Sequence, residues 1–139
     1  MTGLTIDQIS VGQSADFSKT ITETDVYMFA GITGDMNPAH LNEEYAKGTI
    51  FNGRIAHGML AAGLISTVLG MYLPGPGSIY LKQDLRFTAP VRFNDTITAT
   101  CTVKEVNTEK NRIKLDCVVV NQEGVAVVSG EALIMPPKN

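Results

Sequence analysis

Cysteine is scarce in this chain: its 139 residues include only two, Cys101 and Cys117. Both lie in apolar, strand-like stretches, and neither has another metal-ligating residue close to it in a zinc-like spacing. Because disulfide frameworks and zinc sites need several such side chains at short spacings, the sequence supports neither. We predict that both thiols are buried as small apolar groups.

An excess of basic charge is also lacking. The formal net charge is -3, from 11 basic and 14 acidic residues, and the basic residues form no run. This composition argues against a nucleic-acid partner, which would require a concentrated basic surface. The opening segment, MTGLTIDQISVGQS, has neither the basic nor the apolar part of a signal peptide, which predicts a cytoplasmic protein. The length predicts one domain, residues 1–139.

Charged residues are absent from the segment between Gly58 and Tyr80. A membrane helix needs about 20 apolar residues, but here the apolar part ends near Leu73, where PGPG stops a helix. We therefore predict a buried core helix from Gly58 to Leu73. A helix that is apolar on all sides must be covered on all sides. One small sheet cannot do this, so the sequence also predicts a dimer.

Strand patterns dominate the rest of the chain. One strand is expected within 15–24, and four follow the helix, at 78–88, 95–107, 111–121 and 124–135. Between the first strand and the long helix, we predict a helix that is capped by Thr22 or Thr24 and ends near Gly34, and a short helical piece capped by Asn42. The first of these helices should carry an apolar side made of Val26, Phe29, Ala30 and Ile32. The economical fold is α+β, with one long central helix wrapped by a curved antiparallel sheet.

Asp35 and His40 lie on either side of a predicted bend. Gly34 permits a sharp helix exit, and the pair Asn37-Pro38 favours a turn. Across such a bend the two side chains would converge as a general acid–base pair, and Asn37 would position a water or a carbonyl group. The plain alternative is that Asp35 caps the next helical piece and His40 is an ordinary loop histidine.

His57 and Gly58 stand at the start of the long helix. The first turn of a helix has free backbone N–H groups and the positive end of the dipole, and glycine lets a ligand approach the backbone closely. Such a site would hold a carbonyl oxygen that becomes an oxyanion. Alternatively, Gly58 serves tight packing and His57 caps the helix. The residues alone leave both interpretations open.

The stretch from Phe29 to Ala46 resembles the signature of the MaoC-like, or hydratase 2, family. That signature is an aromatic residue, a spacer, Gly-Asp-x-Asn-Pro-x-His, and a small residue six positions later. The matching residues are Phe29, Thr33, Gly34, Asp35, Asn37, Pro38, His40 and Ala46. Three further segments, AHGML at 56–60, LPGPGSIYLKQDLRFTAPV at 73–91 and VSGEALI at 128–134, resemble single-domain (R)-specific enoyl-CoA hydratases.

The resemblance implies a hot dog fold, a homodimer or an assembly of dimers, and the reversible hydration of trans-2-enoyl-CoA to (R)-3-hydroxyacyl-CoA. It implies Asp35 and His40 as the catalytic residues, with Asn37 orienting and the Gly58 N–H binding the thioester oxygen. No metal or other cofactor is implied, because CoA is part of the substrate. Candidates to meet the CoA phosphates are Arg54, Lys82, Arg86 and Arg92.

Three other functions remain open at this point. The same chemistry on acyl carrier protein would make the chain a 3-hydroxyacyl-[acyl carrier protein] dehydratase, but such carriers are acidic and the sequence shows no concentrated basic stretch. Hot dog proteins also include acyl-CoA thioesterases, which lack the Asp-x-Asn-Pro-x-His bend. The third is a non-catalytic acyl-CoA binding subunit.

Overall fold

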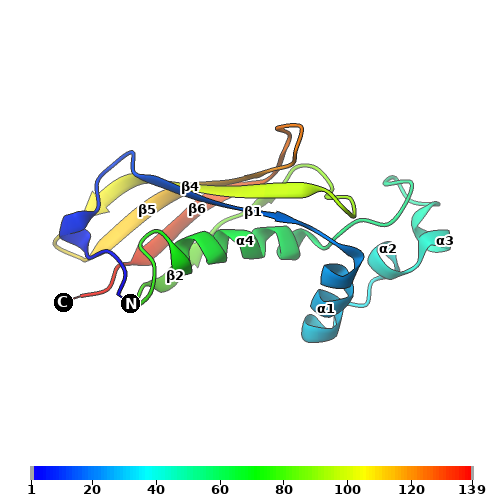
Figure 1. Cartoon of the computed structure of the whole chain (residues 1–139), viewed down its shortest axis with the longest axis horizontal. Helices are drawn as coiled ribbons and strands as arrows, with labels where there is room; N and C mark the ends of the chain where they lie inside the picture. Colours follow the sequence, from blue (N-terminus) through cyan, green and yellow to red (C-terminus); the bar gives the residue numbers. More distant parts are fainter. Residues whose placement is uncertain (1, 139) are drawn as a thin grey trace.

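A six-stranded antiparallel sheet and one central helix form the body of the molecule (Figure 1), and the computed structural model describes residues 2–138. The strands are β1 (Ser14–Thr20), β2 (Ile79–Gln83), β3 (Arg86–Phe87), β4 (Thr96–Asn107), β5 (Arg112–Val120) and β6 (Ala126–Met135). Their order is β1-β4-β5-β6-β2, and β3 also pairs with β6. A 3₁₀ turn, η1 (Ile6–Gln8), precedes β1. Every strand predicted from the sequence is present.

The first strand predicted after the helix is divided into β2 and β3. At the break, the chain passes very close to β6 at Gly130, where an added Cβ would lie 1.9 Å from the carbonyl oxygen of Asp84. The Asp84 N–H donates to the Glu131 carbonyl at 3.1 Å. The residue opposite the break is therefore a glycine because no side chain fits there.

The central helix, α4 (Gly58–Met71), packs against β1, β4, β5 and β6, and its buried side forms the middle of the core. It begins where the sequence predicts and ends two residues before Leu73. The sheet covers one side of the helix only, as expected, and Gly63, Ser66 and Gly70 form an outer face that is exposed in the single chain. Among residues 2–138, no helix is long and apolar enough to span a membrane.

The long strands β4 and β5 confirm the predicted alternation. Ile97, Cys101 and Val103 of β4 are each at most 1% exposed, while the intervening threonines face outward. Cys101 lies directly opposite Cys117 of β5, which is 3% exposed, so both thiols are buried as predicted. The arrangement of sheet and helix is the hot dog fold that the family resemblance implies.

Three short helices form an insertion between β1 and α4, at one end of the sheet (Figure 1). They are α1 (Glu23–Thr33), α2 (Pro38–Leu41) and α3 (Glu43–Ala46). Thr22 caps α1 and Asn42 caps α3, as predicted. The predicted apolar side of α1 is only partly right, because Val26 and Ala30 are buried but Ile32 is 80% exposed. The helix lies at the edge of the core, which covers a narrow strip of it.

Candidate active site

The predicted bend after α1 is present, and it contains the one-turn helix α2. Gly34 has φ 80°, the left-handed conformation that glycine adopts without strain. The Asp35 Oδ1 accepts the Asn37 N–H at 3.2 Å, and the Asn37 Oδ1 accepts the Ala39 N–H at 3.0 Å. The caps of α2 and α3 are therefore Asn37 and Asn42, and the alternative that Asp35 caps the next helical piece is wrong.

His40 projects from α2 and is 9% exposed. Its Nδ1 lies 2.8 Å from the carbonyl oxygen of Ile55. Because a carbonyl oxygen only accepts hydrogen bonds, Nδ1 carries the proton, and the Nε2 of the neutral ring keeps its lone pair. The backbone thus fixes the tautomer of His40 and leaves Nε2 as its proton acceptor.

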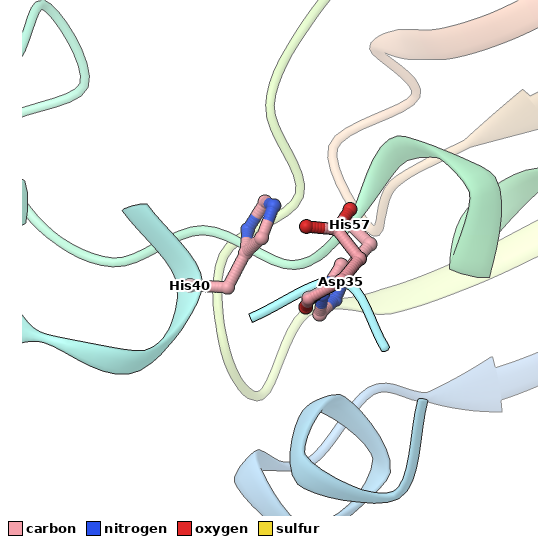
Figure 2. A group of neighbouring side chains, drawn as sticks. All are labelled: Asp35, His40 and His57. Carbon is pink, nitrogen blue, oxygen red and sulfur yellow. The ribbon is translucent and has the colours of Figure 1, made fainter. Parts of the chain in front are cut away.

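The Asp35 carboxylate, His40 and His57 lie together (Figure 2). One carboxylate oxygen and one nitrogen from each ring all lie within 4.8 Å of one another. A water that donates both protons at ordinary hydrogen-bond lengths joins two acceptors that are roughly 4.5 Å apart. A distance within this limit suits a single water held between the Asp35 carboxylate and the His40 ring, whose Nδ1 is already bonded to the Ile55 carbonyl.

His57 holds both members of this pair. Its Nε2–H donates to the Asp35 carbonyl at 3.0 Å, and its ring stacks on the His40 ring with 3.8 Å between centroids. Phe29 of α1 packs against its other side, at 4.7 Å between centroids. His57 is the N-cap residue of α4, as the capping interpretation has it, but its ring makes no capping hydrogen bond and is used for these contacts instead. Sequence reasoning missed this role, because the bond is to a backbone carbonyl that any residue would supply.

The same three side chains have the donor types of a metal site, but their geometry does not favour one. The two imidazole rings are only 30° from parallel. Metal ligands must direct their in-plane lone pairs at one point, and rings stacked this closely share no such point near their nitrogens. One of the rings would have to rotate before both could bind one ion.

A cavity of about 480 Å³ opens beside these residues. Asp35, His40 and Gly58 all line it, as the sequence predicted for a shared site, and most of the remaining wall is apolar. Gly58 is the first residue of α4, so its N–H has no acceptor within the helix. The packing interpretation of Gly58 is also right, because a Cβ there would lie 2.7 Å from the Phe87 ring.

Asn37 and two of the four basic candidates make contacts with other protein groups outside this cavity. Asn37 does not line this cavity among the described residues, since its side chain caps α2. Arg54 binds Glu23 and Glu43, and Arg92 donates to the carbonyl oxygens of Phe51 and Gly53. Of the four basic candidates for CoA phosphates, only Lys82 and Arg86 have no ion pair or side-chain hydrogen bond within residues 2–138.

A family model described as a MaoC like domain matches residues 7–125. The chain belongs to the MaoC-like family. A relative from Rhodospirillum rubrum named (R)-specific enoyl-CoA hydratase is 53% identical, covering 94% of this chain and 90% of the relative. A relative from Methylorubrum extorquens named 3-hydroxybutyryl-CoA dehydratase is 46% identical, covering 97% of this chain and 85% of the relative.

A solved structure matches the fold over almost the whole chain. It is the unliganded R-hydratase PhaJ1 from Pseudomonas aeruginosa, with a TM-score of 0.93 and 45% identity, covering 99% of this chain and 88% of that chain. The insertion that carries Asp35 and His40 is thus part of a fold shared over almost the whole chain.

Proposed function

We propose that this MaoC-like protein is an (R)-specific enoyl-CoA hydratase, which adds water reversibly to trans-2-enoyl-CoA and forms (R)-3-hydroxyacyl-CoA. The observation that carries the proposal is that the Asp35 carboxylate and a nitrogen of the His40 ring lie within 4.8 Å of each other and that both residues line one largely apolar cavity. The names of the relatives at 53% and 46% identity, a hydratase and the reverse dehydratase, support the same chemistry on CoA thioesters.

The proposed reaction needs one water and two proton transfers. The thioester carbonyl is conjugated with the C2=C3 double bond, so C3 is electrophilic. The water held by Asp35 and His40 loses a proton to this pair and attacks C3, and the pair returns a proton to C2. General acid–base catalysis of this kind contributes roughly 10²–10⁴-fold to the rate. No oxidation state changes, so the reaction calls for no redox cofactor.

Negative charge develops on the thioester oxygen as C3 is attacked. We propose that the Gly58 N–H donates a hydrogen bond to this oxygen. The N–H has no acceptor within α4, and Gly58 lines the cavity. The start of α4 adds the positive end of the helix dipole. Losing one such donor typically costs ~10²–10³-fold in rate. Asn37 orients the dyad indirectly in this scheme, by capping the helix that carries His40.

The acyl chain would occupy the apolar part of the cavity, along Phe87, Ala89, Val91 and Val128. Lys82 and Arg86 are then the candidates to meet the CoA phosphates. We treat residues 1–139 as one MaoC-like hot dog domain, which the family match over 7–125 supports. The cytoplasm as its location stays a prediction from the sequence.

A homodimer is part of the proposal. The edge strand β2 exposes Ile79, Tyr80 and Leu81, each at least 41% exposed. An apolar edge strand of this kind pairs readily with another chain, and a second copy would cover it. Light scattering at micromolar concentration should therefore report at least twice the 14.9 kDa mass of one chain. A fully active species with the mass of one chain would exclude the dimer.

The direct test of the function is hydration of crotonyl-CoA and longer trans-2-enoyl-CoAs, with chiral analysis of the product. We expect loss of the conjugated enoyl thioester absorbance and an (R)-3-hydroxyacyl product. Release of free thiol from saturated acyl-CoA would indicate a thioesterase instead. Binding of enoyl-CoA without turnover would indicate a non-catalytic subunit, and turnover only on acyl carrier protein would indicate a dehydratase of that carrier.

A further inference from the structure

One guanidinium group joins the separate segments that carry the active site. The Nη2 of Arg54 lies 2.8 Å from the Glu23 Oε1, and its Nη1 lies 2.9 Å from the Tyr27 hydroxyl. Its Nε lies 3.3 Å from the Glu43 Oε2. All three donor nitrogens are thus in use, toward two residues of α1 and one of α3.

Two more contacts complete this group, which we call the Arg54 clamp (Arg54, Glu23, Tyr27, Glu43 and Phe93). The guanidinium carbon lies 4.8 Å from the centre of the Phe93 ring, between β3 and β4. The Arg54 backbone N–H also donates to the Glu43 Oε2 at 3.2 Å. The Arg54 side chain is 19% exposed, whereas those of Glu23 and Glu43 are 49% and 45% exposed, so the clamp lies at the surface and its directional bonds contribute to geometry more than to stability.

Each acidic or phenolic partner of Arg54 lies on a segment that leads to a group of the proposed site, although Glu23 is twelve and Tyr27 eight residues before Asp35. The helix that holds Glu23 and Tyr27 ends two residues before Asp35, and Glu43 follows His40 by three residues. Arg54 itself precedes Ile55, whose carbonyl fixes the tautomer of His40, and it stands four residues before Gly58. The clamp therefore ties together the three segments that supply the acid, the imidazole and the oxyanion donor.

We propose that Arg54 is a positioning residue, which sets Asp35, His40 and Gly58 at the spacing that hydration requires. It touches neither the cavity nor the dyad, so it acts through the segments it joins. The inference rests on the proposed hydratase function. Displacing a catalytic group by about 1 Å costs on the order of 10²-fold in rate, and the loss of one guanidinium releases three segments at once.

The main test is Arg54→Ala, with Arg112→Ala as the matched control. Within residues 2–138, the guanidinium of Arg112 bonds only to the carbonyls of Lys110 and Asn111, outside the cavity. We expect kcat on crotonyl-CoA to fall on the order of 10-fold to 10²-fold in Arg54→Ala, with KM little changed. Arg112→Ala should match the wild type. Millimolar guanidinium should restore part of the lost kcat, and methylammonium, which lacks the planar fork, should restore less.

Imidazole ¹⁵N NMR gives a second readout that needs no substrate. The chain has only two histidines, so the spectrum contains two rings, and His57→Gln assigns them. In the wild type His40 should be protonated at Nδ1 and His57 at Nε2. In Arg54→Ala the His40 ¹⁵N chemical shifts should move toward the averaged values of a ring that exchanges between its two tautomers. The reason is that the Ile55 carbonyl is no longer held in place.

A folded Arg54→Ala protein with wild-type kcat overturns the proposal, whether or not its KM has risen. Unchanged His40 tautomers in Arg54→Ala overturn it too. If Arg54→Ala does not fold, the exposed Tyr27→Phe, which deletes one bond of the clamp, must lower kcat in the same direction, and a wild-type kcat there is equally decisive. If the wild type itself does not hydrate enoyl-CoA, the proposed function fails, while the NMR experiment still decides whether Arg54 positions His40.

Discussion

Replacing Asp35 by Asn should remove catalysis while leaving the bend intact. The Asp35 Oδ1 accepts the Asn37 N–H at 3.2 Å, and an asparagine Oδ1 keeps that bond, so only the charge and the basicity are lost. His40→Gln removes the titratable ring, while the amide of glutamine still offers a donor for the Ile55 carbonyl. We expect each variant to lower kcat for crotonyl-CoA hydration by about 10²-fold or more.

That loss corresponds to at least about 2.7 kcal/mol of activation free energy for each variant. The two residues share one water, so the double variant should lose far less than the product of the single effects. The assay follows the enoyl thioester absorbance, with circular dichroism and thermal unfolding to establish that each variant folds. Asp116→Asn, the same change at an exposed carboxylate of β5, serves as the control. If either dyad variant is folded and retains near-full activity, Asp35 and His40 are not the catalytic pair.

Three further outcomes are expected. His57→Gln should cost less kcat than either dyad variant, because a glutamine amide can still donate to the Asp35 carbonyl; an equal loss would mean that His57 transfers protons. Gly58→Ala should destabilise the fold by about 1–3 kcal/mol through overpacking against Phe87, and adding Phe87→Ala should relieve this in urea unfolding; no relief would contradict the contact. Two hydrogen bonds, the larger effect coming from Tyr27 and the smaller from Arg54, lower the pKa of Glu23 below its usual range. Its stabilisation is therefore present above the ordinary glutamate pKa and is lost as pH falls through the lowered value. The unfolding free energy of the wild type should fall more steeply below about pH 4.5 than that of Glu23→Gln, and parallel curves would contradict this.

The sequence predicts the regular elements well because each has a strong local signal. Alternation along β4 puts Cys101 and Val103 on the same face of the strand. Once one face of the sheet is covered, the apolar face is the one that becomes buried. The lack of charge after Gly58 and the PGPG segment bound α4 to within two residues. Helical spacing also explains the exposed Ile32, because it follows Ala30 by two residues, about 200° around the helix, and so lies on the side away from the buried Val26 and Ala30.

The dyad is predictable for a different reason. Asp35, the Asn37-Pro38 turn and His40 form a long motif whose side chains are the types that acid–base chemistry needs, and Asp35 and His40 line one cavity. The groups that orient them are main-chain carbonyls, those of Ile55 for His40 and of Asp35 for His57. Every residue type has a main-chain carbonyl, so the amino-acid sequence does not indicate which carbonyl will orient a histidine. Asn37 shows the converse, because its amide suits substrate contact but is used as a helix cap.

Different interactions hold the two parts of the candidate site, which are the start of α4 and the insertion that carries Asp35 and His40. Gly58 begins a helix whose buried side, with Leu64, Ile65 and Val68, is part of the main core, so its position depends on apolar packing. The insertion with Asp35 and His40 buries few residues and is joined to the start of that helix by charged hydrogen bonds, above all through Arg54. Apolar packing largely determines global stability, whereas directional bonds determine geometry. The proposed chemistry should therefore be sensitive to changes in the clamp that hardly alter the free energy of unfolding.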